Sequence, residues 1–320
     1  MRVAVSGSTG RLGGALVRAL ADAPFTGPAG PTAWTRADFD LDAPAGVTVA
    51  LDRDRPEVVV HAAAWTDVDG CAREPDLALR RNGEATGVLA AACAARGIDL
   101  VVVSTNEVFD GRRTDGQPYL PTDPTAPANP YGASKLAGEQ ASLAAFDGAS
   151  AALGIARTAW LYGPPGRDFP RKILEAADRA QATGEPLRAV ADEWGTPTYA
   201  ADVADAIVEL LADDAHGGIH HLVGGGVATR ADWARDIVAR FRLTVHVEDV
   251  PATTWARASD PPRWGVLAPT PLPSFEPIRP WTQAMADYAP TLERAWRDAR
   301  TAHARAAGAR GADARAASAR

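Results

Sequence analysis

A tyrosine and a lysine four residues apart are the strongest candidates for chemistry in this sequence. Tyr131 and Lys135 stand in the stretch Asn-Pro-Tyr-Gly-Ala-Ser-Lys, and lysine occurs at only one other position, Lys172. On a helix these two side chains share one face, where the ammonium group can stabilise a tyrosinate and lower the tyrosine pKa from about 10 toward neutrality. Such a tyrosine exchanges a proton with a substrate oxygen. Thr105, at the end of an expected strand, is predicted to hydrogen-bond the same oxygen, whereas a chance Tyr/Lys pair is disfavoured by the rarity of lysine.

A glycine-rich loop near the N-terminus is a candidate for binding phosphate. The stretch Gly7-Ser8-Thr9-Gly10-Arg11-Leu12-Gly13 follows one expected strand and begins an expected helix. Glycines at these spacings allow a tight turn, close approach of backbone amides to a pyrophosphate and close packing of the helix on the strand. The spacing is GxxGxxG rather than GxGxxG, so an ordinary strand-to-helix turn is the alternative. Together with the other motifs, the loop predicts nucleotide binding.

The residue after the second expected strand, near Thr32–Thr35, bears on the choice of nicotinamide cofactor. An acidic residue in this region, about 20 positions beyond the glycine loop, is typical of NAD-binding folds. This chain has Arg36 there. An arginine can pair with the ribose 2′-phosphate, so Arg36 favours NADPH and leaves NADH as the alternative. A solvated surface arginine is the competing interpretation, because almost all basic residues of this chain are arginines.

The elements that must position these residues alternate through the first half of the chain. The expected strands are Val3–Ser6, Val58–Ala64, Leu100–Ser104 and Ala152–Thr158, and the expected helices are Leu12–Ala21, Asp76–Arg96 and Tyr131–Ala145. Strands that are apolar throughout are typical of a parallel sheet covered on both faces. The sequence therefore predicts an α/β fold with a Rossmann-type, doubly wound parallel sheet and a smaller C-terminal substrate-binding lobe.

The second half of the chain divides between these two parts. Residues 1–160 are predicted to form the NAD(P)-binding domain, completed by segments of about residues 188–223. Residues 161–187 and 224–296 are predicted to form the substrate-binding lobe, with the substrate pocket between the two. The segments behind this division are expected helices at Asp168–Thr183, Ala201–Ala212 and Arg230–Arg242, and expected strands at His220–Val223 and Val245–Val250. Residues 297–320 are rich in alanine and arginine, and we expect a frayed helix that passes into a disordered tail.

Composition excludes several functional classes. With 320 residues, 46% hydrophobic residues and a net charge of −7, the chain is predicted to be compact, and a general nucleic-acid or anionic-membrane binder is excluded. No run of about 18 apolar residues occurs, so we expect a cytoplasmic protein without a membrane partner. Cys71 and Cys93 lack the spacing of a zinc site or a disulfide framework, and no metal is expected.

Five motifs in a fixed order carry a resemblance to a known family. They are the glycine loop, Ala-Ala-Ala-Trp-Thr-Asp-Val-Asp (62–69), Ser-Thr-Asn-Glu-Val-Phe-Asp-Gly (104–111), Asn-Pro-Tyr-Gly-Ala-Ser-Lys (129–135) and Arg-Thr-Ala-Trp-Leu-Tyr-Gly (157–163). Together, over Met1 to about Val250, the chain resembles the extended short-chain dehydrogenase/reductases, and within them the dTDP-4-dehydrorhamnose reductase branch. This resemblance implies a reductase of deoxysugar biosynthesis that delivers hydride to the C4 ketone of a nucleotide-linked 4-keto-6-deoxy sugar. It leaves a homodimer open.

The resemblance also implies a role for individual residues. It assigns catalysis to Thr105, Tyr131 and Lys135, with Tyr131 as the proton donor. It implies that the cofactor is held by Gly7, Gly10, Arg11, Leu12 and Gly13 under the pyrophosphate, by Asp40 and Leu41 near the adenine, and by Ala62, Ala63, Ala64 and Thr66 along the ribose and nicotinamide. Thr105, Asn106 and Trp160 would face the sugar, although a core aromatic is an equally weighted interpretation of Trp160.

Departures from the family pattern keep two alternatives in view. The arginine that meets the nucleotide diphosphate in the family is replaced by Pro261, and we expect Arg263 to take that role.

A nucleotide-sugar 4-epimerase or 4,6-dehydratase shares the scaffold, but dehydratases have an acidic residue where this chain has Asn106, which cannot donate an acidic proton. A non-catalytic NADP-binding regulatory subunit is the other alternative, and the retained Thr105, Tyr131 and Lys135 argue against it.

Overall fold

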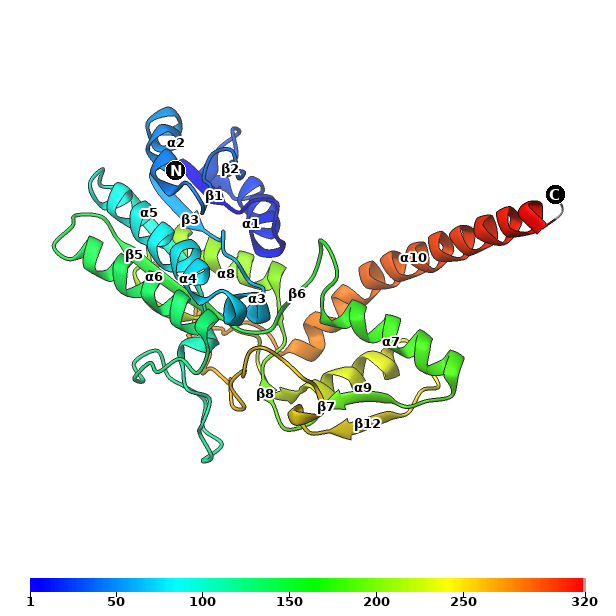
Figure 1. Ribbon diagram of the computed structural model, residues 1–320. Helices are drawn as coiled ribbons and strands as arrows, with labels where there is room; N and C mark the ends of the chain where they lie inside the picture. Colours follow the sequence, from blue (N-terminus) through cyan, green and yellow to red (C-terminus); the bar gives the residue numbers. More distant parts are fainter. Residues whose placement is uncertain (319–320) are drawn as a thin grey trace.

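A six-stranded parallel sheet lies at the centre of the larger part of the molecule (Figure 1). The computed structural model describes residues 1–318. Its strands are β1 (Val3–Ser6), β2 (Thr32–Trp34), β3 (Val58–His61), β4 (Asp99–Thr105), β5 (Leu153–Thr158) and β10 (Gly218–His221). They lie in the order β10-β5-β4-β3-β1-β2. The winding changes direction between β1 and β3, the position where ligands bind in such sheets. The predicted doubly wound fold is confirmed.

Two helical layers cover the sheet because successive strand residues point to opposite faces. Val3 and Val5 contribute to the core beneath α1 and α8, while Ala4 and Val59 contribute to the core on the other face, with α2 and α5. Helix α6 packs beside α5. The helices of this part are α1 (Arg11–Ala21), α2 (Val47–Asp54), α3 (Val68–Arg73), α4 (Pro75–Ala78), α5 (Ala85–Ala94), α6 (Pro130–Phe146) and α8 (Ala200–Ala212). A π-helical segment, Leu79–Glu84, joins α4 to α5, so the single helix expected over Asp76–Arg96 is interrupted.

The smaller lobe has its own core around Trp233, which is fully buried. This core is formed by α7 (Phe169–Thr183), α9 (Arg230–Arg240), the first turns of α10 (Trp281–Ser318), and β7 (Leu187–Val190), which pairs in parallel with β12 (Val247–Val250). The chain was expected to return to the larger domain at about residue 188. It returns later, with α8 and β10, because β7 finds its partner strand in the smaller lobe.

Short strand pairs surround the junction of the two parts. β6 (Leu161–Tyr162) pairs with β9 (Thr198–Tyr199), and β8 (Trp194–Gly195) pairs with β11 (Ala228–Thr229). Each pair joins segments that are more than 30 residues apart in the sequence. Residues that precede α8 are thereby held next to residues that precede α7 and next to residues that precede α9.

Helix α10 is longer than the sequence predicts, and the last two residues of the chain lie outside the described residues. A frayed helix and then a disordered tail were expected from Arg297, whereas the helix continues to Ser318, and residues 319–320 lie outside the described residues. Trp296, buried against the smaller lobe, donates a hydrogen bond from Nε1 to Asp178 Oδ2 (2.8 Å). Within residues 1–318, none of the helices combines the length and the apolar character needed to span a bilayer.

Candidate active site

Strand β4 and helix α6 bring the three predicted catalytic residues together. Thr105 ends β4, and α6 begins at Pro130, directly after Asn129, whose side chain accepts a hydrogen bond from the Gly132 amide. Tyr131 and Lys135 lie one turn apart on the same face of α6. The Thr105 hydroxyl lies near Tyr131, where it acts to lower the pKa of the tyrosine, and Lys135 is buried, with 4% of its surface exposed. A hydroxyl pair and an ammonium group therefore meet at the carboxyl end of the sheet.

The electrostatics of this group differ from the expectation. Burial raises the pKa of Tyr131, the negative charge of Glu107 raises it further, and the hydrogen bond from Thr105 lowers it. The predicted fall of this pKa toward neutrality is therefore absent, because desolvation disfavours the tyrosinate. The pKa of Lys135 shifts instead. Burial lowers it to about 8, although the negative charge of Glu139 acts to raise it. Within the pair, the lysine is the group that titrates near neutral pH.

Glu107 also belongs to this site, although no role in the reduction was predicted for it. It follows Thr105 in a short 3₁₀ helix, Asn106–Val108, and its Oε2 accepts a hydrogen bond from Asn129 Nδ2 (2.6 Å). Burial raises the pKa of Glu107, and the hydrogen bond from Asn129 opposes that rise. The same asparagine thus caps α6 and fixes a carboxyl group beside Tyr131.

A groove of about 320 Å³ runs along the switch point of the sheet, where a dinucleotide is expected. Eight predicted cofactor residues line it: Gly7, Gly10, Arg36, Asp40, Leu41, Ala62, Ala63 and Ala64. The backbone of Gly7 has φ +67°, and an added Cβ would lie 2.7 Å from the Ala63 nitrogen. Only glycine fits there, because the turn after β1 touches the segment after β3. The structure also adds Asp42, Trp65 and Arg81 to the lining, none of which was predicted.

Four other predicted cofactor residues do not line this groove. Leu12 lies in the core beneath α1, and Thr66 is exposed outside the groove. A Cβ at Gly13 would lie 2.1 Å from the Gly7 carbonyl oxygen, so Gly13 serves the close packing of α1. Arg11 Nε donates to the Gly163 carbonyl (2.6 Å), which ties the start of α1 to the loop before α7. Gly13 therefore allows α1 to pack on the loop, and Arg11 ties α1 to the junction of the two parts.

Helix α6 is tied to the groove by a buried asparagine. Asn82 Oδ1 accepts from the Trp65 amide (2.8 Å), and Asn82 Nδ2 donates to Ser134 Oγ (3.1 Å) on α6. Asn82 is 1% exposed. Because one side chain bonds both elements, α6 holds Tyr131 in fixed relation to the cofactor groove.

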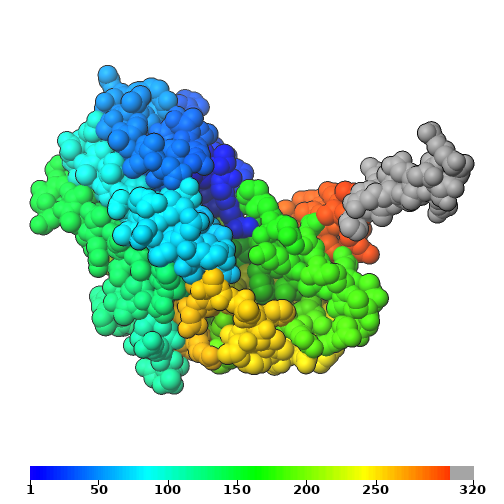
Figure 2. All heavy atoms as spheres, viewed as in Figure 1, coloured from blue at the N-terminus to red at the C-terminus, as the bar shows by residue number. Residues whose placement is uncertain are grey.

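The surface is hollowed where the two parts meet, as Figure 2 shows between the blue and cyan N-terminal segments and the green segment at α7. On the side of the smaller lobe, Trp160 stacks on Trp233 with ring centroids 6.2 Å apart. The Arg230 guanidinium lies 3.5 Å from the centre of the Trp160 ring. Trp160 is thus a packing residue whose ring also contacts a cation.

A basic pocket of about 400 Å³ lies on the smaller lobe beside this junction. It is lined by the cations Lys172, Arg188, Arg230 and Arg257, the aromatic residues Phe169 and Trp255, and the aliphatic residues Ile173, Ala189 and Val190. Arg257 pairs with Glu193 (2.9 Å) and Arg188 with Glu248 (3.1 Å). Within the described chain, Arg230 and Lys172 form no ion pair, and burial lowers the pKa of Arg230 to about 10. Four cations, with no carboxylate in the described lining, suit an anionic ligand that carries an aromatic ring.

Two residues predicted to meet the substrate make protein contacts instead. Asn106 is buried, and its Nδ2 donates to the Gly265 carbonyl (3.2 Å), which holds the loop that follows Pro261. Arg263 Nη1 pairs with Asp192 Oδ2 (2.9 Å), and 59% of the Arg263 side chain is exposed. It does not line the basic pocket. Arg263 instead lines an adjoining pocket, which shares Trp255 and Arg257 with the basic pocket.

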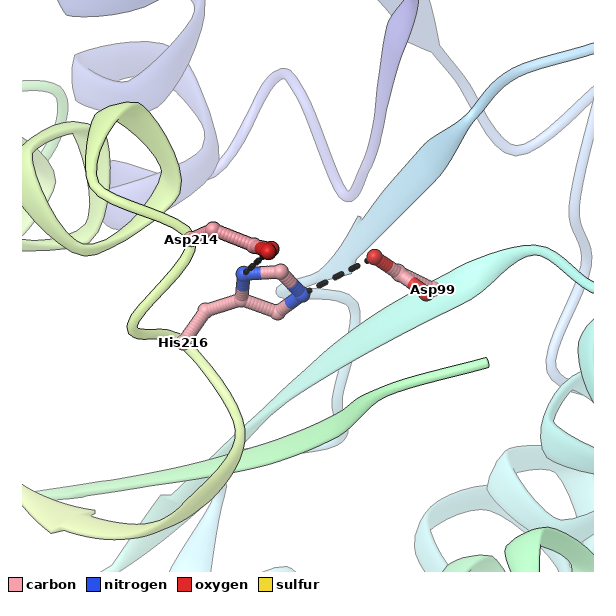
Figure 3. Close-up of side chains that lie close together, drawn as sticks. All are labelled: Asp99, Asp214 and His216. Atoms are coloured by element: carbon pink, nitrogen blue, oxygen red, sulfur yellow. Dashed lines mark hydrogen bonds and ion pairs between the residues drawn. The ribbon is translucent and has the colours of Figure 1, made fainter. Parts of the chain in front are cut away.

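A cluster of potential metal ligands lies at the opposite edge of the sheet (Figure 3). His216 Nε2 is 3.1 Å from Asp99 Oδ2, and His216 Nδ1 is 3.9 Å from Asp214 Oδ1. The two carboxylates face different ring nitrogens of one buried imidazole. This arrangement is a hydrogen-bonded link between the start of β4 and the segment before β10.

The chain is similar to known proteins over nearly its whole length. A family model described as RmlD substrate binding domain matches residues 1–294. A dTDP-4-dehydrorhamnose reductase of Streptomyces griseus is 36% identical over 90% of this chain and 93% of its own length. A dTDP-4-keto-6-deoxy-D-glucose reductase of Streptomyces niveus is 38% identical over 90% of this chain and 96% of its own length.

Solved structures give the same assignment. A dTDP-4-dehydrorhamnose reductase from Clostridium acetobutylicum has a TM-score of 0.81 and 27% identity, covering 92% of this chain and 100% of its own. A dTDP-4-dehydrorhamnose reductase from Bacillus anthracis, solved in complex with NADP, has a TM-score of 0.79 and 28% identity, covering 90% of this chain and 98% of its own. The order of the sheet strands, the groove at the switch point and the match over residues 1–294 lead to one conclusion: the chain belongs to the RmlD substrate-binding-domain family.

Proposed function

We propose that this protein is an NADPH-dependent reductase of a dTDP-linked 4-keto-6-deoxy sugar. The observation that carries the proposal is the meeting of Thr105, Tyr131 and Lys135 on β4 and α6, which Asn82 ties to the cofactor groove. Relatives from two Streptomyces species are named as reductases of such sugars, which supports the substrate class.

The groove fits a nicotinamide dinucleotide. The glycine turn that includes Gly7 and Gly10 would hold the pyrophosphate against the start of α1, and Ala62–Ala64 would lie along the ribose and nicotinamide. When bound, the reduced cofactor supplies the hydride that adds to the C4 carbonyl carbon. The NADP complex of the Bacillus anthracis relative supports NADPH as the cofactor, with NADH as the alternative.

Tyr131 is proposed to give its hydroxyl proton to the ketone oxygen as negative charge develops there. Thr105 donates a second hydrogen bond to that oxygen and so helps to orient the carbonyl group. A tyrosine with a raised pKa is fully protonated at neutral pH, so it begins the reaction as a competent acid. The Lys135 ammonium, one turn away, stabilises the tyrosinate that forms, provided that Lys135 is itself protonated.

The basic pocket is proposed to bind the nucleotide end of the substrate. A nucleoside diphosphate carries two phosphate groups and an aromatic base, which match the cations Lys172, Arg188, Arg230 and Arg257 and the rings of Phe169 and Trp255. Arg230 connects this pocket to the Trp160 ring, beside which the sugar would lie. This assignment replaces the role that was expected of Arg263.

The alternatives have less support. Elimination of water needs an acid at the end of β4, and the amide of Asn106 is bonded to the Gly265 carbonyl. A non-catalytic subunit has no need for the assembled Thr105, Tyr131 and Lys135. The reductase proposal uses all three groups.

The proposal is tested by following NADPH oxidation with dTDP-, UDP- and GDP-linked 4-keto-6-deoxy sugars. We expect turnover with the dTDP-linked ketone, and at most weak turnover with the GDP-linked one. Failure to oxidise NADPH with any of the three would reject the proposed function. Product formation should require both the ketone and reduced cofactor, which separates reduction from epimerisation.

A further inference from the structure

One carboxylate at the adenosine end of the cofactor groove lies between two guanidinium groups. Asp42 Oδ2 accepts from Arg36 Nη2 (2.7 Å) and from Arg81 Nη2 (2.8 Å), and Asp42 Oδ1 accepts from Arg81 Nε (2.6 Å). Arg36 also pairs with Asp40 (3.2 Å). All four side chains line the same groove as Gly7 and Gly10. Two arginines, contributed by segments about 45 residues apart in the sequence, thus converge on one anion.

Arg81 is held at this place by more than Asp42. Its guanidinium lies 5.3 Å from the centre of the Trp65 ring, which also lines the groove. The Trp65 backbone is fixed by Asn82, the residue after Arg81. The Arg81 side chain is 27% exposed, whereas its neighbour Arg80 is exposed and forms no ion pair among the described residues.

The ligand that fits two converging guanidiniums best is a phosphate group. A carboxylate carries one charge and two oxygens, whereas a phosphate monoester carries nearly two charges and three oxygens, each able to accept hydrogen bonds from an arginine fork. NADPH carries such a group on the 2′ oxygen of its adenosine ribose, and NADH has a hydroxyl there. The adenosine end of this groove is where that group would arrive.

We infer that Arg81 and Arg36 together form the 2′-phosphate site of NADPH, and that Asp42 competes with the phosphate for both arginines. This inference rests on the proposed function in that the protein uses a nicotinamide cofactor. From the sequence, Arg36 was the one residue expected to favour NADPH over NADH. The second guanidinium makes the selection stronger, and Asp42 weakens it, because the phosphate must displace the carboxylate from both arginines. NADH leaves the Arg36–Asp42–Arg81 contacts in place.

The test is a measurement of Kd for NADPH and for NADH by fluorescence titration of the full-length protein. Arg81→Ala should weaken NADPH binding about tenfold or more, the scale of a lost charge-assisted hydrogen bond, and change NADH binding less than about twofold. Asp42→Asn should tighten NADPH binding, since the competing charge is removed, with little change for NADH. Arg80→Ala is the matched control on the same segment and should change neither Kd.

The possible results separate the inference from the proposed function. An equal loss of both cofactors in Arg81→Ala, or unchanged NADPH binding in that variant, would overturn the inference alone. NADPH binding that weakens in Asp42→Asn would overturn the competition. If the wild-type protein binds neither cofactor, the proposed function and this inference fail together. Unchanged melting temperatures of the variants establish that the Kd values report on folded protein.

Discussion

Lys135 links the burial of a single residue to the pH dependence of the whole reaction. Its pKa is lowered to about 8 by burial, so the ammonium group is present below that pH and is lost above it. Because the proposed mechanism needs the ammonium to stabilise the tyrosinate, kcat should fall as the pH rises through about 8. Steady-state kcat at saturating substrate from pH 6 to 10 measures this. Lys135→Met should lose most activity and also the descending limb.

The lowered pKa of Lys135 also makes the free energy of unfolding depend on pH. Between pH 8 and 10.5 the unfolded chain holds more protons on this lysine than the folded protein does, so the contribution of Lys135 to the free energy of unfolding rises with pH over that range. A kcat that stays flat to pH 10 in the wild-type protein would show that the charge of Lys135 does not support the tyrosinate.

Lys172 is the residue that tests the basic pocket most cleanly. It lines the pocket and forms no ion pair among the described residues, so its removal leaves no carboxylate without a partner. Lys172→Ala should raise KM for the dTDP-linked ketone about three- to tenfold, which corresponds to about 0.7–1.4 kcal/mol, with a smaller change in kcat. Arg263→Ala is the matched control outside the pocket. A larger KM effect in Arg263→Ala than in Lys172→Ala would restore the role first expected of Arg263.

The predicted site residues that the structure brings together are those that stand in one local motif. Tyr131 and Lys135 lie one helical turn apart, and Gly7 and Gly10 lie in one loop, so their spacing alone indicates their joint use. The basic pocket is different. Lys172, Arg188, Arg230 and Arg257 come from separate segments, so no local spacing indicates their joint use, and the three arginines do not stand out in a chain whose basic residues are nearly all arginine.

At the scale of elements, apolar runs predicted where strands occur but not which sheet they join. The parallel strands β1, β4 and β5 match the expected runs to within one or two residues, since buried strands need continuous apolar stretches. β7 contains the exposed Arg188, and no strand was expected there. Its partner β12 lies almost 60 residues further along the chain, and a pairing at that distance leaves no periodicity that the sequence can reveal.

The link between the ends of β4 and β10 gives a prediction about elements. His216 joins Asp99, the first residue of β4, to the segment that leads into β10, across the intervening β5 (Figure 3). His216→Ala should lower the melting temperature by a few degrees, because loss of about 1 kcal/mol shifts Tm by about 2–4 °C in a protein of 150–250 residues. His220→Ala, in which the histidine contacts only a nearby carbonyl, should have a smaller effect. Equal effects in the two variants would contradict the proposed link.

At the scale of the whole molecule, the first turns of α10 contribute to the core of the smaller lobe. Trp281, Met285, Tyr288, Leu292 and Trp296 are its buried large side chains, and residues 301–302 are exposed. Deletion of residues 301–320 should therefore leave the melting temperature within about 1 °C of the wild-type value and leave kcat unchanged. Thermal unfolding and steady-state kinetics of the shortened chain provide the measurement. A drop of several degrees would show that the end of the chain stabilises the fold.

The proposed reduction requires that the two parts of the molecule act on one substrate. The larger part brings Tyr131 and the cofactor groove to the junction, and the smaller part brings the basic pocket and Arg230. Reduction depends on both, because hydride and proton must reach the C4 carbonyl of a sugar held by its nucleotide.

The most direct test follows a labelled hydride. NADPH that carries deuterium at the transferring position is incubated with the wild-type protein and dTDP-4-keto-6-deoxy-glucose, and the product is analysed by mass spectrometry and NMR. The account predicts one deuterium at sugar C4 in the wild-type product, and a loss of most turnover in Tyr131→Phe with its cofactor Kd nearly unchanged. A product without deuterium at C4, or near-normal kcat in Tyr131→Phe, would contradict it.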